Sequence, residues 1–346
     1  MATYSVHLRL LFLLLTLSGV QVLGAGFGIN YGQIADNLPS PSSVSVMLQP
    51  LDVSRLKLYD ANPKVLQAFS NSSVEFIVGI GNGYLQDMAD PVKAQNWVQQ
   101  NLQPYLAQTK ITCISVGNEV FMTNDTQMWS YLLPAMKTVY NTLVNLGLDK
   151  QVIVTTAHPF TIIGDSYPPS SGTFRQDVIE YMQPILDFHS QTKSPFLINA
   201  YPFFAYKDNP DQIPLDYVLF QPNQGMTDPN TNLHYDNMLY AQVDAVYSAI
   251  KAIGHTDVEV KISETGILYL QLGDIRFSIL DPCLGYPNSG ERRRDKQPKS
   301  NTTNRIATGR FFIGSVRQNP SEVAYFVHAP SGDALTCSAC CFEIYL

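Results

Sequence analysis

The stretch ITCISVGNE, residues 111–119, has a pattern that recurs along the chain and predicts its architecture. Its first part is rich in apolar and β-branched residues, as expected of a buried strand, and it ends in the polar pair Asn118 and Glu119. Six further runs of the same kind lie on either side of it. They are Phe27–Tyr31, Arg55–Tyr59, Phe76–Ile80, Val152–Thr156, Phe196–Ala200 and Val258–Ser263.

Helical patterns separate these runs. Apolar residues recur at the i, i+3, i+4 spacing of an amphipathic helix in Pro91–Leu106, Met128–Leu146 and Leu239–Ile253. Strands that alternate with helices favour parallel pairing, and a near-continuous apolar run such as Phe196–Ala200 favours burial on both faces. Seven such units before Gly266 predict a (β/α)8 barrel whose eighth strand is not evident.

A doubly wound open sheet is the alternative. The first run and its flank, Gly28–Gly32, lack the glycine spacing of a phosphate-binding loop. Polar and acidic residues also end many of the runs, whereas a doubly wound sheet gathers them at one switch point. Both observations favour the barrel.

The composition narrows the function. The chain has 346 residues, enough for one large barrel or two ordinary domains. Its net charge of −7 argues against nucleic-acid binding, which needs a basic surface. Only 15% of the residues are charged and 19 are tyrosine, which suits a surface that binds neutral sugars. A lightly charged extracellular surface is the simpler interpretation of the same numbers.

The N-terminus predicts secretion. His7 and Arg9 precede a short apolar run, Leu10–Leu17, and small residues follow it, as in a secretory signal peptide. We expect residues 1–25 to be removed and the protein to reach the apoplast or cell wall. The apolar run is too short to cross a bilayer, no later segment is a better candidate, and no lipid-anchor signal is evident. Three glycosylation sequons fit secretion; they begin at Asn71, Asn124 and Asn301.

The cysteines do not form a disulfide framework, because their number is odd and their spacing uneven. They are Cys113, Cys283, Cys337, Cys340 and Cys341. Cys113 lies in an apolar run and is predicted to be a buried free thiol. The cysteine-rich tail has no histidine or second cysteine pair at ligand spacing, so we predict no metal site there.

Polar residues stand where the predicted strands end, which is where a parallel barrel carries its chemistry. They are Tyr31, Tyr59, Asp60, Asn82, Asn118, Glu119, His158, Asn199, Tyr201 and Glu264. Of these, His158 precedes a proline and is expected to be a structural hydrogen-bonding group rather than an acid or base. Asp60 either orients a neighbour or caps a helix.

Two isolated glutamates, Glu119 and Glu264, end the fourth and seventh runs. Glycoside hydrolysis needs such a pair, because one carboxylic acid protonates the leaving oxygen while a second carboxylate attacks the anomeric carbon. A single glutamate at a strand end is more often a salt-bridge partner. Two of them, at the ends of different strands, favour catalysis.

These motifs resemble those of the plant glucan endo-1,3-β-glucosidases of glycoside hydrolase family 17. The resemblance is collinear over residues 26–266 and rests on eight segments. They are Gly28–Gly32, Leu58–Asp60, Ser115–Val120, Leu133–Met136, Asn199–Phe204, Tyr235–Met238, Ala241–Tyr247 and Ile262–Gly266.

The resemblance implies a barrel that hydrolyses β-1,3-glucan with retention of configuration, without a cofactor or metal. By position, it implies that Glu119 is the general acid/base and Glu264 the nucleophile. It further implies substrate binding by Tyr59, Asn118, Tyr201 and Phe203. We expect a monomer whose partner is the polysaccharide. The raised pKa that an acid needs would come from the charge of Glu264 and from partial burial of Glu119.

The resemblance stops at Gly266, so residues 267–346 form a divergent C-terminal segment. Our hypothesis is that 267–285 are an insertion, such as translated intron, and that the tail is read out of frame. The family's eighth strand, with its further carboxylate and lysine, is absent, and only Glu322–Val327 has the pattern of a strand. Three interpretations therefore stay open: an active β-1,3-glucanase, a glucan-binding relative without turnover, and a glycosidase for another glucan linkage.

Overall fold

The computed structural model describes residues 28–34, 38–51, 53–266, 270–272, 275–277 and 342–345. One eight-stranded sheet dominates this part of the chain, in the order β11-β8-β5-β4-β3-β2-β1-β14. Its strands are β1 (Gly28–Tyr31), β2 (Arg55–Leu58), β3 (Glu75–Ile80), β4 (Lys110–Asn118), β5 (Ile153–Pro159), β8 (Phe196–Asn199), β11 (Val260–Glu264) and β14 (Phe342–Tyr345).

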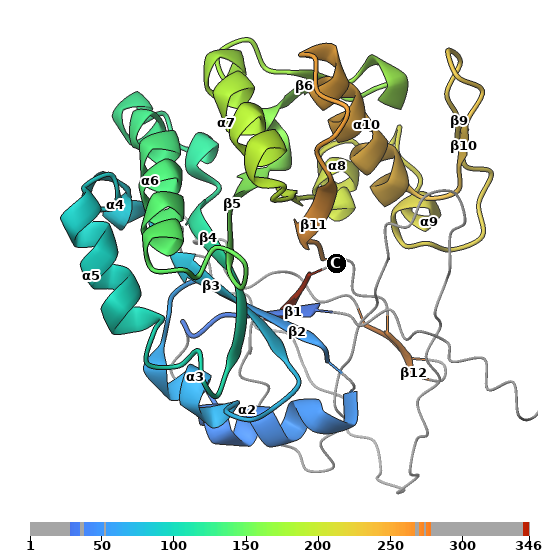
Figure 1. Ribbon diagram of the computed structural model, residues 1–346. Helices are drawn as coiled ribbons and strands as arrows, with labels where there is room; N and C mark the ends of the chain where they lie inside the picture. Colours follow the sequence, from blue (N-terminus) through green and yellow to red (C-terminus); the bar gives the residue numbers. More distant parts are fainter. Residues whose placement is uncertain are drawn as a thin grey trace, which may run out of the picture.

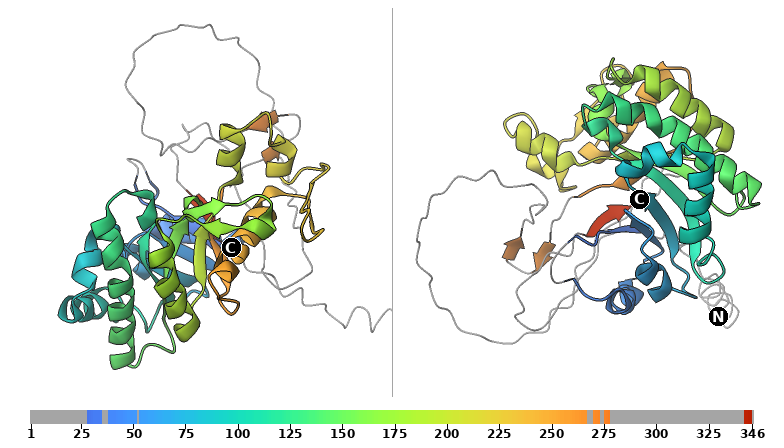
Figure 2. Two further views of the ribbon diagram at one scale, coloured as in Figure 1. Left: turned by 90° about the horizontal axis from the view of Figure 1, so that it is seen from above. Right: turned by 90° about the vertical axis from the view of Figure 1, so that its left-hand side faces the viewer.

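Strands β1, β2, β3, β4, β5, β8 and β11 of this sheet pair in parallel. They coincide with the seven predicted runs, although the bounds differ at the strand ends. β14 pairs antiparallel with β1 and also contacts β11. In Figure 2 it lies between the blue and orange ends of the sheet, which thereby curls into a nearly closed barrel. The (β/α)8 expectation is therefore met by seven parallel strands and one antiparallel strand. The segment Glu322–Val327, predicted to be a strand, lies outside the described residues, as does the predicted signal peptide.

Helices cover the outside of the sheet (Figure 1). Their bounds are α2 (Pro41–Leu48), α3 (Pro63–Ala68), α4 (Leu85–Met88), α5 (Pro91–Asn101), α6 (Thr126–Asn145), α7 (Ile179–Thr192), α8 (Pro202–Asp208), α9 (Leu215–Val218) and α10 (Met238–Ala252). Besides short 3-10 helices, the described elements also include three short antiparallel strand pairs. They are β6 (Ile163–Asp165) with β7 (Thr173–Phe174), β9 (Met226–Thr227) with β10 (His234–Tyr235), and β12 (Leu270–Leu272) with β13 (Ile275–Phe277).

Successive strand residues alternate between two environments. On β3, Phe76 and Val78 belong to the large core between sheet and helices, while Ile77 packs inside the barrel with Cys113 and Leu197. This follows from the two-residue repeat of a strand. Cys113 is a buried free thiol, as predicted, and burial raises its pKa to about 12. On β2 the same alternation turns Leu56 outward and Lys57 toward the barrel axis.

Among the described helices, none combines the length and the apolar character needed to cross a membrane.

Candidate active site

Glu119 and Glu264 lie at the same end of the barrel. Glu119 directly follows β4, and Glu264 is the last residue of β11. β8 and β5 lie between β11 and β4 in the sheet, and residues at and just after the end of β8 contact both glutamates: Asn199 Nδ2 donates to Glu119 Oε1 at 2.9 Å, and the Tyr201 hydroxyl donates to Glu264 Oε2 at 2.9 Å. The backbone N–H of Ala200 also donates to the carbonyl oxygen of Glu264 at 2.8 Å. The structure thus brings the two predicted carboxyl groups to one place.

Lys57 holds Glu264 from inside the barrel, and sequence reasoning missed it. Its Nζ donates to Glu264 Oε1 at 2.6 Å, to Ser263 Oγ at 2.6 Å and to Asn118 Oδ1 at 3.1 Å. The Lys57 and Glu264 side chains are only 1% and 6% exposed, so this is a buried ion pair. Three oxygen acceptors around one ammonium group satisfy its three donors, which a buried charge requires. A signal was present in the sequence, because a lysine between the two leucines of a short apolar run is unusual.

The backbone around Glu119 is bent to aim its side chain. Glu119 has φ 52° and Gly117 has φ 72°, both in the left-handed region. A side chain at Gly117 would meet Val120 Cγ2 at 2.8 Å, so only glycine fits there. A non-glycine residue in this region costs on the order of 1–3 kcal/mol, and such strain is concentrated at functional sites.

Asn82, at the end of β3, holds this bend in place. Its Oδ1 accepts from the backbone N–H of Asn118 at 2.8 Å, and its Nδ2 donates to the carbonyl oxygen of the same residue at 2.8 Å. Both backbone polar groups of Asn118 are therefore fixed by a single side chain. The neighbouring Glu119 N–H donates to the Ala157 carbonyl at 2.8 Å, which ties the bend to β5.

The pKa of Glu119 is raised above its ordinary value of 4.5, in the direction expected of a general acid. Burial is the largest cause, and the nearby charge of Glu264 adds to it. The hydrogen bond from Asn199 and the charge of Lys57 oppose the rise. Glu264 has different partners, since its two carboxylate oxygens accept hydrogen bonds from the Lys57 ammonium group and the Tyr201 phenol.

The environment of Glu119 predicts how Asn199→Ala changes pH dependence. The Asn199 amide stabilises the ionised carboxylate, so its removal raises the pKa of Glu119 further. If Glu119 must be protonated for bond cleavage, the basic limb of the kcat/KM profile on glucan moves to higher pH. The variant's free energy of unfolding should also depend on pH. Ionising Glu119 costs more in the variant, so its loss of stability is absent at low pH and appears as the pH rises through the raised pKa of Glu119. A basic limb that stays at the same pH or moves to lower pH would contradict this prediction. Asn62→Ala, which removes a helix cap at the surface, is the control.

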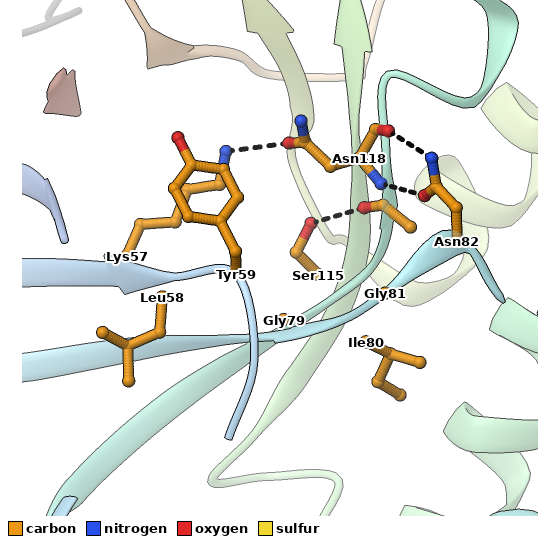
Figure 3. Close-up of a pocket in the computed structure, with 10 residues that line it drawn as sticks. Lys57, Leu58, Tyr59, Gly79, Ile80, Gly81, Asn82, Ser115 and Asn118 are labelled. Carbon is orange, nitrogen blue, oxygen red and sulfur yellow. Dashed lines mark hydrogen bonds between the residues drawn. The ribbon is translucent and has the colours of Figure 1, made fainter. Parts of the chain in front are cut away.

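The remaining predicted site residues differ in their placement. Asn118 and Tyr59 line a cavity beside the carboxyl pair (Figure 3). Tyr201 binds Glu264 directly. The ring of Phe203 packs near the rings of Phe204 and Tyr206 on α8, at 6.5 and 6.0 Å. Its predicted substrate contact stays a prediction.

His158 and Asp60, two of the predicted strand-end residues, contact neighbouring protein groups. The ring of His158 stacks on Phe196 at 4.5 Å and on Phe121 at 5.8 Å, and burial lowers its pKa to about 3. Its Nε2 has no hydrogen-bond partner in the described part of the chain, and its expected role as a structural hydrogen-bonding group stays a prediction. Asp60 does not cap α3, since Asn62 does; its Oδ1 instead accepts from the Asn62 N–H.

No cluster of three or more potential metal ligands occurs within the described residues. The cysteine-rich tail lies outside them.

Comparison with known proteins identifies the family. The sequence pattern of Glycosyl hydrolases family 17 matches residues 27–268, which is more than two thirds of the chain. This chain belongs to glycosyl hydrolase family 17. Family 17 membership confirms the resemblance drawn from the eight sequence segments.

Relatives in family 17 include glucan endo-1,3-beta-glucosidase 14 of Arabidopsis thaliana, which is 64% identical over 77% of this chain and 69% of its own length. Glucan endo-1,3-beta-glucosidase 11 of the same plant is 55% identical over 74% of this chain and 61% of its own length. The chain therefore spans less than two thirds of the second relative.

Two solved structures share the fold. CJP38, a β-1,3-glucanase and allergen of Cryptomeria japonica pollen, is 39% identical with a TM-score of 0.68, over 72% of this chain and 77% of that one. One of two plant β-glucan endohydrolases with distinct substrate specificities is 33% identical with a TM-score of 0.65, over 69% of this chain and 76% of that one. Both support the barrel architecture of this family 17 member.

Proposed function

We propose that this chain cleaves β-1,3-glucan internally and with retention of configuration, with Glu119 as general acid/base and Glu264 as nucleophile. The observation that carries the proposal is the unlike environment of the two carboxyl groups. Burial raises the pKa of Glu119, whereas Lys57 and Tyr201 both donate to Glu264. Two carboxyls kept in different protonation states are what an acid and a nucleophile require.

The placement of the pair also suits retention. Asn199 and Tyr201 are two residues apart, and each donates to one carboxyl group. Asn199 ends β8 and Tyr201 directly precedes α8, so both side chains leave the chain at the same strand end. Retaining glycosidases need their carboxyls about 5–5.5 Å apart, which is compatible with two groups held by such neighbours.

The reaction would proceed in two displacements. A Glu264 oxygen forms a bond to the anomeric carbon, the bond from that carbon to the leaving glucan oxygen breaks, and Glu119 gives its proton to that oxygen. A water molecule then gives its proton to Glu119 and forms a bond to the same carbon, while the ester bond to Glu264 breaks. Glu119 ends protonated and Glu264 ionised, as they began.

An assay of new reducing ends on laminarin tests the proposal. The wild-type chain should release a ladder of oligosaccharides, and Glu264→Gln should reduce the release below detection while laminarin binding remains. Glu259→Gln, at an exposed glutamate paired with Lys261 before the same strand, should keep full activity. Binding without release by the wild-type chain would instead favour the glucan-binding interpretation. Faster release from a β-1,4 or mixed-linkage glucan would favour another substrate.

The site of action is also a proposal. The signal-like segment and the sequons in the sequence support secretion to the apoplast or cell wall, where β-glucan is the available polymer. Expression with the native N-terminus, followed by N-terminal sequencing of the secreted product, should give a start close to Gly26. Retention of the whole chain inside the cell would contradict it.

A further inference from the structure

Two of the three glycosylation sequons lie in the described part of the chain, at opposite ends of the barrel. The sequon that begins at Asn71 follows α3 and precedes β3, so it lies where the parallel strands start. The sequon that begins at Asn124 follows β4 and precedes α6, so it lies at the end of the barrel that holds Glu119 and Glu264. The third, at Asn301, lies outside the described residues. The same modification would therefore meet different surroundings at Asn71 and at Asn124.

Asn71 lies in a turn that leaves the residue exposed. Its φ of 60° is in the left-handed region, which asparagine tolerates better than most residues. Its backbone N–H donates to the Gln108 carbonyl at 2.6 Å, which ties the turn to the segment before β4. Its side-chain amide makes no hydrogen bond to another described residue. A bulky group on Nδ2 therefore breaks no hydrogen bond between described residues.

Asn124 lies in an exposed loop whose conformation depends on its neighbours. Asp125 caps α6, because its side chain accepts from the Met128 N–H at 3.1 Å. The Trp129 Nε1 donates to the Thr123 carbonyl at 3.1 Å, which ties the start of the loop to the same helix. The side-chain amide of Asn124 makes no hydrogen bond within the described ranges. Modification of that amide therefore leaves the described contacts of the loop intact.

Asn124 is also close to the reacting centre. It stands five positions after Glu119, and five extended residues span at most about 18 Å. The actual path is shorter, because Val120–Met122 form a 3-10 helix, which rises only about 2 Å per residue. The Met122 N–H donates to the Glu119 carbonyl at 2.9 Å, which fixes the start of this path. A large group on Asn124 therefore stands beside the residue that protonates the leaving oxygen in the proposed reaction.

We propose that Asn71 and Asn124 both carry N-linked glycans, and that the glycan on Asn124 hinders long glucan chains from reaching the carboxyl pair. This inference rests on the proposed secretion and on the proposed cleavage of β-1,3-glucan. An N-glycan is bulky, so on Asn124 it excludes a polymer from part of the space beside Glu119. On Asn71 the glycan lies at the other end of the barrel. A short substrate needs less of the space beside Glu119, so the hindrance should act on polymer.

The modification is a transfer from a lipid-linked oligosaccharide diphosphate, a co-reactant of the secretory route. The asparagine Nδ2 forms a bond to the first anomeric carbon of the oligosaccharide, and the bond from that carbon to the diphosphate oxygen breaks. Nδ2 loses one proton, and the lipid diphosphate leaves with the electron pair of the broken bond. The hydroxyl residues that complete the two sequons, Ser73 and Thr126, are exposed like the asparagines.

The first test maps the glycans on the full chain secreted from plant cells. Enzymatic release of the glycans in heavy-oxygen water converts each glycosylated asparagine into a labelled aspartate, which peptide mass spectrometry detects. We expect the label at Asn71 and at Asn124. Ser73→Ala should remove the first label and Thr126→Ala the second. Thr126→Ser is the matched control, because serine also completes a sequon, so the label at Asn124 should remain.

The second test compares the kinetics of these variants on laminarin and on the aryl glycoside of laminaribiose. Thr126→Ala should raise kcat/KM on laminarin by about threefold or more, through a lower KM, because only access changes. Thr126→Ser and Ser73→Ala should match the wild-type chain on laminarin. All four proteins should cleave the aryl glycoside at the same rate and share one melting temperature, which excludes a change in folding as the cause.

The outcomes separate this inference from the proposed function. A secreted chain without the label at Asn71 or at Asn124 overturns the assignment of that position. A labelled Asn124 with equal laminarin kinetics for Thr126→Ala and Thr126→Ser overturns the hindrance alone. A glycosylated chain that cleaves no β-glucan overturns the proposed function and the hindrance with it, while both modification sites stand.

Discussion

Lys57→Met is expected to lower the free energy of unfolding by about 3–5 kcal/mol at neutral pH, because it leaves the Glu264 carboxylate buried without its cation. Both side chains of the pair are almost fully buried, and their atoms approach to 2.6 Å. The loss should shrink as the pH is lowered, since protonation of Glu264 removes the unpaired charge. Chemical denaturation at several pH values measures it.

The double variant Lys57→Met with Glu264→Gln separates charge from packing. It removes both charges, so it should be more stable than Lys57→Met alone. Subtracting the effects of both single variants, Lys57→Met and Glu264→Gln, from that of the double variant gives the coupling between the two side chains. Lys93→Met is the surface control. The Lys93–Asp87 pair is equally short at 2.6 Å but more than half exposed on the lysine side, and it should contribute little because solvent screens it. A small, pH-independent loss for Lys57→Met would show that the buried pair is not coupled.

Removing the carboxyl group of Glu119 is expected to lower activity strongly. Glu119→Ala should lower kcat on laminarin by about 10²–10⁴-fold, the usual contribution of a positioned acid or base. Aryl glucosides with an acidic phenol should lose less in the first step, because their leaving group needs no proton. Stopped assays measure both: phenol release reports on the aryl glucosides, and new reducing ends report on laminarin.

Added azide then distinguishes the two roles. With Glu119→Ala, azide should attack the glycosyl-enzyme without needing a base and give the β-glycosyl azide. With Glu264→Ala, azide should replace the nucleophile on the opposite face and give the α-glycosyl azide. Anomeric analysis of the products by NMR therefore assigns each glutamate, and the reverse outcome would exchange the roles. Glu259→Gln is the control, because its substitution lies at an exposed position; it should form no glycosyl azide.

Several elements were predictable because their patterns are local. The seven parallel strands follow from short apolar runs, and α6 and α10 from the helical spacing of their buried faces. Since parallel strands place their C-terminal ends on one side, the convergence of Glu119 and Glu264 also followed from the order of the elements. α7 was not predicted. Its interior Pro184 is not the reason, because α6 was predicted and carries Pro134 in its interior.

Local sequence patterns were enough to predict which residues form the parallel strands and that two glutamates end two of them, because strand and helix periods are properties of neighbouring residues. The contacts of Lys57 with Ser263 and Glu264, more than two hundred residues away, and the place of β14 as the eighth strand depend on how the whole chain folds. The two-residue repeat assigns Lys57 to a face of β2. Curling of the sheet is what makes that face an interior and brings β2 across from β11, and no local pattern encodes that distance.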